Sequence, residues 1–124
     1  MKKILIVEDD TVLIKALRNV FAKEMGLEVS FANNGVGGIR KALAEHPDLI
    51  LLDLVLPMMD GISVLKELRE DDWGRKAQVI ILTNLADESK VAESMRAGVS
   101  DYLIKSNWKI KDLVQKVKDK LGIK

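Results

Sequence analysis

The 124-residue chain contains no cysteine, which excludes disulfide scaffolds, cysteine-ligated zinc, iron–sulfur clusters and thiol catalysis. It has a single histidine, His46, so a zinc site or a conventional serine hydrolase triad lacks its usual parts. Excess charge of one sign is also lacking, because 20 Lys and Arg stand against 19 Asp and Glu, for a formal net charge of +1. No global basic field therefore indicates nucleic-acid binding, and we expect no direct contact with nucleic acid.

Long hydrophobic runs are absent as well, and none approaches the length that spans a bilayer. Lys2 and Lys3 precede an apolar stretch like the start of a signal peptide, but the acids at 8–10 interrupt it. We therefore expect a cytoplasmic protein with no membrane segment. The length suits one compact domain, residues 1–124, and is too short for a second domain of ordinary size.

Short apolar runs alternate with longer segments of helical period, a pattern that is typical of repeated βαβ units. The runs predict strands at 4–7, 28–32, 49–53, 79–82 and 101–104. The periodic segments predict helices at 11–25, from the turn at 33–35 to about 46, at 61–70, 87–97 and 110–121, with a polar loop at 71–76. Right-handed crossovers and the need to cover both faces of a parallel sheet favour a doubly wound, three-layer α/β fold.

Polar side chains stand at the end of four of these apolar runs. Asp53 closes the run at 49–52, and alone it would most often be a helix cap or a turn residue. However, the acids at 8–10, Thr83 and Lys105 end three other runs in the same way. If the strands are parallel, their carboxyl ends lie on the edge where open α/β folds place ligands. We therefore expect one pocket built from residues that are distant in sequence.

These motifs together resemble the receiver domain of bacterial two-component response regulators. They are Glu8-Asp9-Asp10, Asp53 with a Leu-Pro-x-Met-Asp-Gly tail at 56–61, Thr83, and Asp101-Tyr102-x-x-Lys105. The match covers nearly the whole chain, and its five motifs occur in the correct order. The resemblance implies a flavodoxin-like, five-stranded parallel sheet of order 2-1-3-4-5 with five helices.

The resemblance also implies a chemistry for Asp53. Its carboxylate would accept a phosphoryl group, in a phosphorelay, from a phosphohistidine on a sensor histidine kinase or a phosphotransfer protein. Two anions meet in this step, so a divalent cation is needed, and the family uses Mg²⁺. Asp9 and Asp53 would bind the ion directly, with the backbone carbonyl of Val55 as a third ligand and Glu8 acting through water.

Three further residues would form the switch. Thr83 and Lys105 would each bind a phosphoryl oxygen and so draw the ends of two strands toward the modified carboxylate. Tyr102 matches the aromatic position whose side chain turns inward in the active state of the family. An ordinary, partly buried strand aromatic is an equally weighted interpretation of Tyr102. Asp10 follows the acidic pair, and we expect it to cap the first helix rather than to bind metal.

Two residues depart from the pattern of the family. Ser106 stands where proline usually follows the lysine, often with a cis peptide. A cis bond before a residue other than proline costs roughly 3 kcal/mol, so we expect a trans bond and a locally different loop. Asn84 stands where alanine or glycine is common, and we expect it to narrow access to the phosphoryl group.

Several other features have simple structural interpretations. The glycines at 35–38 do not follow the first strand, as a dinucleotide-binding loop would, and are expected to serve a turn and a tightly packed helix. His46 is expected at an exposed helix end, and Trp73 as a hydrophobic plug in the loop at 71–76. The lysines of the last helix are expected to form a solvated face.

The leading hypothesis is a stand-alone receiver that phosphorylates itself, does not turn over an external substrate, and switches a protein-interaction surface. A downstream protein or an effector domain would be its partner. A homodimer through the segments 87–97, 101–104 and 110–121 is possible, with Met95 and Trp108 near that surface. The alternatives are a receiver fragment of a longer regulator, a phosphorylation-independent scaffold, and a Mg²⁺-dependent hydrolase with a phosphoaspartate intermediate. The hydrolases usually have a second acid where this chain has Val55.

Overall fold

The computed structural model describes residues 1–123 and contains a five-stranded sheet. The strands are β1 (Lys2–Val7), β2 (Leu27–Ala32), β3 (Leu49–Leu52), β4 (Val79–Thr83) and β5 (Asp101–Ile104). Their order across the sheet is β2-β1-β3-β4-β5, and all neighbouring strands run parallel. The strand order and direction expected for a doubly wound, flavodoxin-like α/β fold are confirmed.

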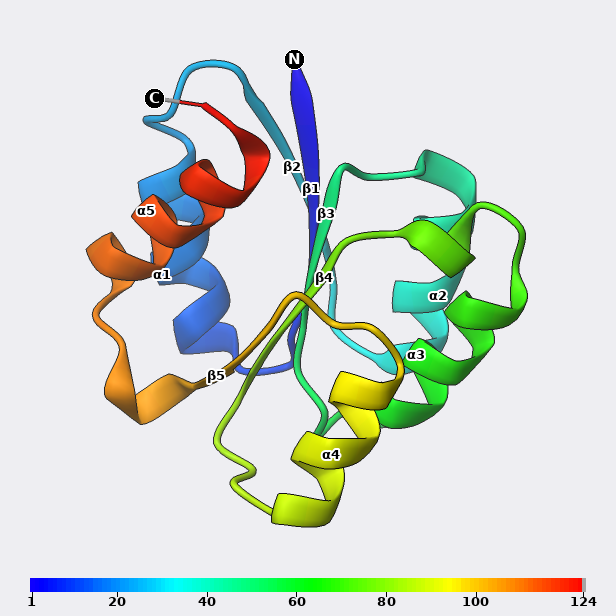
Figure 1. Ribbon diagram of the computed structural model, residues 1–124. Coiled ribbons are helices and arrows are strands. Elements are labelled where there is room, and N and C mark those ends of the chain that lie inside the picture. The colour runs from blue at the N-terminus through cyan, green and yellow to red at the C-terminus, as the bar shows by residue number, and fades with distance from the viewer. Residues whose placement is uncertain (124) are drawn as a thin grey trace.

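Four α-helices connect successive strands, a fifth follows β5, and all five cover the sheet. They are α1 (Thr11–Phe21), α2 (Gly35–Glu45), α3 (Gly61–Glu70), α4 (Glu88–Arg96) and α5 (Ile110–Leu121), and short 3-10 turns lie at Gly74–Lys76 and Lys105–Asn107. Figure 1 shows α1 and α5 on one face of the sheet and α2, α3 and α4 on the other. Within residues 1–123, no helix combines the length and the apolar character that crossing a membrane requires.

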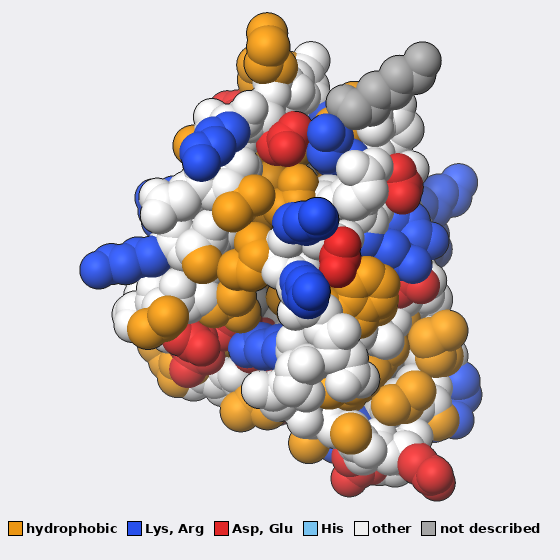
Figure 2. Space-filling model, turned by 90° about the vertical axis from the view of Figure 1, so that its left-hand side faces the viewer, with side chains coloured by type: hydrophobic (Ala, Val, Ile, Leu, Met, Phe, Trp, Pro, Cys, Tyr) orange, Lys and Arg blue, Asp and Glu red, His pale blue; other side chains and the backbone are white. Residues whose placement is uncertain are grey.

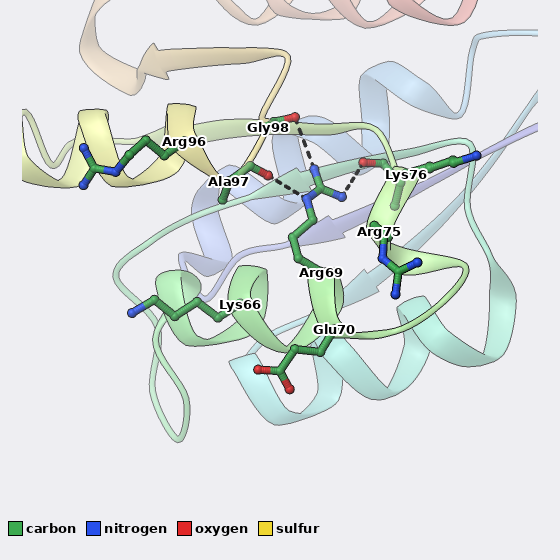
Figure 3. Close-up of a pocket in the computed structure, with 9 residues that line it drawn as sticks. Lys66, Arg69, Glu70, Arg75, Lys76, Arg96, Ala97 and Gly98 are labelled. Carbon is green, nitrogen blue, oxygen red and sulfur yellow. Dashed lines mark hydrogen bonds between the residues drawn. The ribbon is translucent and has the colours of Figure 1, made fainter.

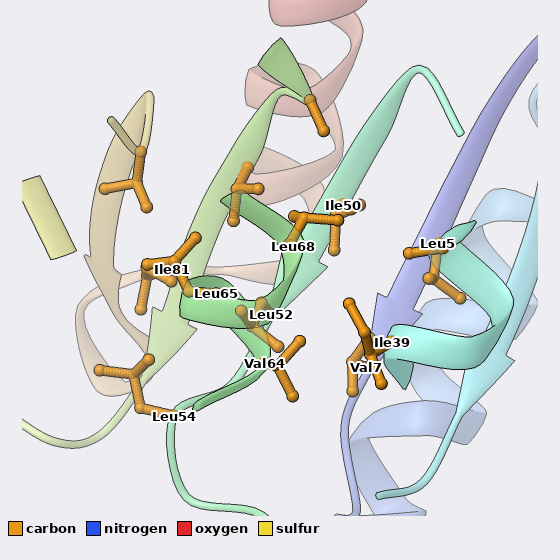
Figure 4. Packing of buried hydrophobic residues seen from close by; sticks show 14 of the residues in the cluster. Leu5, Val7, Ile39, Ile50, Leu52, Leu54, Val64, Leu65, Leu68 and Ile81 are labelled. Atoms are coloured by element: carbon orange, nitrogen blue, oxygen red, sulfur yellow. The ribbon is translucent and has the colours of Figure 1, made fainter. Parts of the chain in front are cut away.

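Each strand contributes side chains to two separate hydrophobic cores, because successive side chains point to opposite faces of a sheet. Leu5 and Leu52 belong to the first core, between the sheet and the helices α2 and α3 (Figure 4). Ile4 and Leu51 belong to the second core, which α1 and α5 cover. Burial of one such side chain contributes about 1.5 to 3 kcal/mol, so the two cores together hold the three layers in place.

The start of α1 is as expected, but its end is not. The side chain of Asp10 caps the helix by accepting bonds from the backbone N–H groups of Val12 and Leu13, at 3.0 and 3.3 Å. The predicted extension to Met25 is wrong, because the helix ends at Phe21. Phe21 is its last buried residue, and none of residues 22–25 is buried, so nothing holds a further turn against the sheet.

The loop at 71–76 lies at the amino-terminal edge of the sheet and contains one of the 3-10 turns. Trp73 packs against the first core and is half-buried, which confirms its expected role as a plug. The exposed ring of His46, at the C-terminal cap of α2, stacks on Trp73 with a centroid distance of 4.3 Å. The second tryptophan, Trp108, packs against the other core.

Arg69 of α3 connects the C-terminal end of α4 to the rest of the fold. Its guanidinium lies in a hollow of about 550 Å³ beside the turn at Gly74–Lys76 (Figure 3). The guanidinium donates hydrogen bonds to four backbone carbonyls, those of Gly74, Ala77, Ala97 and Gly98, over distances of 2.7 to 3.2 Å. Burial lowers the pKa of Arg69, although an arginine remains charged in proteins. These bonds fix the C-terminal end of α4.

The body of α4 is held much less firmly. Among the described residues of this helix only Ser94 is buried, and its hydroxyl has no hydrogen-bond partner. Val91 is half-buried, and Met95 is 50% exposed. A helix with so little buried apolar surface is stabilised weakly by packing, which makes α4 the least firmly anchored of the five helices.

Candidate functional site

The carboxyl ends of four strands bring polar side chains together at one edge of the sheet. Glu8 follows β1, Asp53 follows β3, Thr83 ends β4, and Lys105 follows β5. The backbone N–H of Asp53 donates to the carbonyl of Val7 at 3.0 Å, which places its side chain beside that of Glu8. Glu8, Asp53 and Thr83 are 2%, 4% and 0% exposed, so the polar groups of this site are nearly removed from water.

Lys105 neutralises part of the buried negative charge. Its Nζ lies 2.7 Å from Asp53 Oδ2 and 2.7 Å from Glu8 Oε1. Burial raises the pKa of Glu8 above its usual value, although the bond from Lys105 opposes this effect. Burial lowers the pKa of Lys105, but its bonds to Asp53 and Glu8 outweigh burial and the net shift is upward. The ammonium is therefore held firmly in its charged form between the two carboxylates.

Three carboxylates of this site are arranged as possible ligands for one metal ion. Oxygen atoms from Glu8, Asp9 and Asp53 all lie within 4.8 Å of one another. Asp9 is exposed, whereas the other two side chains are buried, so the cluster extends from the floor of the site toward solvent. The surrounding pocket of about 270 Å³ has room for water. Carboxylates with water are the ligands that a hard divalent cation such as Mg²⁺ prefers.

The loop from β3 to α3 begins at the buried carboxylate of Asp53 and needs a glycine at its end. Asp53 Oδ1 accepts a bond from the N–H of Val55 at 3.1 Å, and Val55 itself is 59% exposed. The side chain of Asp60 caps α3 through the N–H of Ser63 at 2.9 Å. A Cβ on Gly61 would lie 2.3 Å from the carbonyl oxygen of Asp53, so only glycine permits this close return of the chain.

The glycine run at 35–38 does not contribute to this pocket. A Cβ on Gly35 would lie 1.8 Å from the carbonyl oxygen of Met59, in the loop from β3 to α3. A Cβ on Gly38 would lie 2.7 Å from Val7 Cγ1 on β1. These glycines allow α2 to pack closely against the loop and the sheet, as the sequence indicated.

Thr83 and Tyr102 meet at the loop that leads from β4 to α4. The hydroxyl of Thr83 accepts a bond from the N–H of Leu85 at 3.3 Å, and the hydroxyl of Tyr102 donates to the carbonyl of Leu85. The ring of Tyr102 is half-buried against the first core. Burial, with the nearby charges of Asp87 and Asp53, raises the pKa of Tyr102, so the phenol is neutral and able to donate. The end of β4 and the first half of β5 are thereby connected to one loop residue.

The two departures from the family pattern contact each other. The N–H of Ser106 donates to Oδ1 of Asn84 at 3.2 Å, which joins the loop after β4 to the turn after β5. No cis peptide bond occurs among residues 1–123, so the trans bond expected before Ser106 is confirmed. The contact between Asn84 and Ser106 was not predicted, because side-chain amides give no sequence signal for a partner so distant along the chain.

The pocket thus gathers most of the residues that the sequence singled out. Its lining consists of Glu8, Asp9, Asp10, Asp53, Val55, Thr83, Asn84 and Lys105. Tyr102 lies outside this lining and is hydrogen-bonded to Leu85, a residue that sequence reasoning did not select. The arrangement offers a buried carboxylate beside a metal-ligand cluster, a cation and a hydroxyl. Such a set can accept a phosphoryl group and stabilise its charge.

Comparisons with known proteins agree with this description. Residues 4–118 match the family model described as response regulator receiver domain. The chain is 37% identical to the regulatory protein AtoC of Escherichia coli over 85% of its own length, but spans only 22% of that longer protein. It is 31% identical to the chemotaxis protein CheY of Bacillus subtilis, with 83% of this chain and 84% of that protein covered.

A solved structure extends the similarity to three dimensions. The receiver domain of the sensor histidine kinase PA1611 from Pseudomonas aeruginosa, solved with a magnesium ion in its active-site cleft, superimposes with a TM-score of 0.83. Its sequence is 30% identical, and 98% of each chain is covered. The fold, the family model and the curated relatives therefore agree, and the chain belongs to the response regulator receiver domain family.

Proposed function

We propose that Asp53 is the phosphoryl acceptor of a two-component phosphorelay and that Mg²⁺ is the cofactor of the transfer. The observation that supports this most directly is the position of Lys105, whose Nζ lies 2.7 Å from Asp53 beside the three-carboxylate cluster. This cation and the hydroxyl of Thr83 are suitable partners for two phosphoryl oxygens. The donor would be a phosphohistidine on a sensor histidine kinase or a phosphotransfer protein.

The same geometry supports a proposed set of metal ligands. Three carboxylates within 4.8 Å fit a single hard cation, and Asp9 and Asp53 would bind it directly. Glu8 bonds to Lys105 and would act through water, while the carbonyl of Val55 would be a further ligand. When bound, Mg²⁺ neutralises charge as the phosphoryl group approaches the carboxylate. The similar receiver domain from Pseudomonas aeruginosa holds magnesium in its cleft, which supports this choice of ion.

Phosphorylation would change the charge at the centre of the pocket and release a local switch. A phosphoryl group adds up to two negative charges, and its oxygens compete for Lys105 and for the hydroxyl of Thr83. The hydrogen bond from the N–H of Leu85 to the hydroxyl of Thr83 would then break. This would also disturb the carbonyl of Leu85, which accepts a hydrogen bond from Tyr102. Because α4 follows this loop and has only Ser94 buried, its position would change at small cost.

The output surface would consist of α4, β5 and α5. Charged side chains of both signs lie among hydrophobic ones on the side of the molecule seen in Figure 2. Lys116 Nζ lies 5.8 Å from the centre of the Trp108 ring, and Asp101 pairs with Lys116 and Lys120 at 3.7 and 2.9 Å. Met95 of α4 is half-exposed. This mixture suits a reversible contact with a downstream protein, an effector domain or a second copy of the chain.

The remaining parts of the proposal concern the whole protein. Residues 1–124 would act as a single receiver domain in the cytoplasm, without direct contact with nucleic acid or membrane. The domain would catalyse its own phosphorylation and would not turn over an external substrate. An unactivated phosphate monoester, unlike an acyl phosphate, should not phosphorylate Asp53, so no release of phosphate above background is expected, and repeated turnover of the monoester would contradict this part.

Intact-protein mass tests the acceptor. The protein is incubated with Mg²⁺ and a small acyl phosphate, together with the variants Asp53→Asn and Asp60→Asn. We expect one phosphoryl group on the parent and on Asp60→Asn, a matched control on the same loop, and none on Asp53→Asn. Full labelling of Asp53→Asn would overturn the assignment. Asp9→Ala should be labelled only at higher Mg²⁺ concentration, because it removes one of the two direct ligands.

A further inference from the structure

Asn84, which lines the pocket that contains Asp53, is hydrogen-bonded to Ser106, which directly follows the pocket residue Lys105. Asn84 lines this pocket, and each of the two residues directly follows a residue proposed to bind phosphoryl oxygens, Thr83 or Lys105. The bond of 3.2 Å from Ser106 N–H to Asn84 Oδ1 joins two loops that are 22 residues apart in sequence. Both side chains are exposed, whereas Asp53 is 4% exposed, so the bond lies on the solvent side of the carboxylate.

This contact depends on the backbone of residue 106 and not on its side chain. Proline in that position has no N–H and could not donate to Asn84. Alanine would keep the N–H and lose only the hydroxyl. The amide of Asn84 is in turn the acceptor, and an alanine at 84 has no atom that reaches the turn after β5. The donor can therefore be removed with proline at 106 and the acceptor with alanine at 84. Alanine at 106 is the matched control for the loss of the donor.

We propose that the bond between Asn84 and Ser106 acts as a clasp that holds Asn84 at the pocket mouth and so restricts the approach of water and of small phosphoryl donors to Asp53. The inference rests on the proposed role of Asp53 as the acceptor. In hydrolysis a water oxygen bonds to phosphorus while the bond from phosphorus to the Asp53 oxygen breaks. The carboxylate is regenerated, and phosphate leaves with the protons of the water. Asn84 and Ser106 are positioning residues, since neither takes part in these bond changes.

Geometry explains why a clasp in this place controls the rate. Attacking and leaving oxygens lie roughly in line through phosphorus, so water must approach from the side opposite Asp53. That side is the pocket mouth, because the carboxylate lies on the pocket floor. A small donor must pass the same mouth in order to phosphorylate Asp53. Opening the clasp should therefore accelerate both labelling and hydrolysis, whereas loss of Thr83 or Lys105 should slow labelling.

The test compares the parent with Asn84→Ala, Ser106→Pro, Ser106→Ala and the double variant Asn84→Ala/Ser106→Pro. Labelling by a small acyl phosphate and loss of the phosphoryl group after donor removal are followed by intact mass at saturating Mg²⁺. Asn84→Ala and Ser106→Pro should each accelerate both steps about fivefold, which corresponds to about 1 kcal/mol, the net contribution of one neutral hydrogen bond. Ser106→Ala should retain the parental rates.

The double variant distinguishes a clasp from two independent effects. If the residues act through one contact, the double variant should be no faster than the faster single variant. The inference would be overturned if Asn84→Ala lost its phosphoryl group at the rate of the parent. It would also be overturned if the accelerations of the two single variants multiplied in the double variant. Asn84→Ala is decisive by itself, because proline also restricts the backbone of Lys105. An unlabelled parent would instead refute the proposed function, whereas a labelled parent with unchanged variants would refute only the clasp.

Discussion

Replacement of Lys105 by methionine isolates the electrostatic contribution of its ammonium group. Methionine retains most of the aliphatic stem but leaves Asp53 and Glu8 facing each other without a shared cation. At 2.7 Å each ion pair has a gross Coulomb energy of about 6 kcal/mol for an effective dielectric constant of 20. Desolvation of the three groups offsets most of this energy.

Breaking a buried pair by removing one partner typically costs 3 to 5 kcal/mol. Because the pocket opens to water through its mouth, we expect a smaller loss, about 2 to 4 kcal/mol, for Lys105→Met without divalent cations. For a chain of this length the melting temperature should fall by about 4 °C for each kcal/mol. Mg²⁺ should recover much of the loss, because the variant lacks the Lys105 ammonium, which repels the ion.

The assay is urea unfolding of the parent and of Lys105→Met, each with and without Mg²⁺. Lys111→Met, which removes an exposed lysine of α5, serves as the control and should change stability by less than about 0.5 kcal/mol. Mg²⁺ should increase the free energy of unfolding of Lys105→Met more than that of the parent. Equal stability of the two proteins without Mg²⁺, or weaker stabilisation of the variant by Mg²⁺, would refute this reasoning.

Three further predictions concern stability and are checked by urea unfolding. Ser94→Ala should stabilise the protein by about 1 kcal/mol, because it removes a buried hydroxyl that has no partner. Arg69→Met should cost about 2 to 4 kcal/mol, since four backbone carbonyls lose their donor. In the cap of α3, the hydrogen bond from the N–H of Ser63 is the main cause that lowers the pKa of Asp60. The ionised cap therefore stabilises the fold at pH values above the pKa that Asp60 has in the unfolded chain. This contribution is lost as the pH falls through the lower pKa of the folded protein. Asp60→Asn should therefore show a smaller loss of stability than the parent between about pH 6 and pH 2, and an unchanged loss would contradict the assignment.

The sheet was predictable because each of its buried strands needs an almost continuous apolar run. Such runs are rare elsewhere in the chain. Their alternation with segments of helical period favours repeated βαβ units, and hence a parallel sheet, over other folds. The site was predictable for a related reason. Polar residues directly after Val7, Leu52, Leu82 and Ile104 must meet at one edge once the strands are parallel, whatever the details of the loops.

Other features could not be predicted, and the physical reasons differ. The end of α1 depends on which side chains reach the sheet, and Met25 continues the helical pattern without contacting the core. Arg69 bonds only to backbone carbonyls, which every residue possesses, so no pattern of side chains indicates its partners. The contact of Asn84 with Ser106 depends on the conformation of two loops, which propensity and periodicity do not determine.

The two tryptophans lie in different layers of the molecule, and this gives each layer its own fluorophore. Trp73 packs against the first core before β4, and Trp108 packs against the second core after β5. Only Trp108 follows the strand end that carries Lys105. Its emission should therefore respond to modification of Asp53, while Trp73, beside His46, provides an internal reference at the opposite edge of the sheet. Phenylalanine at either position would leave a single tryptophan, so one chain can report separately on signalling and on folding without an added dye.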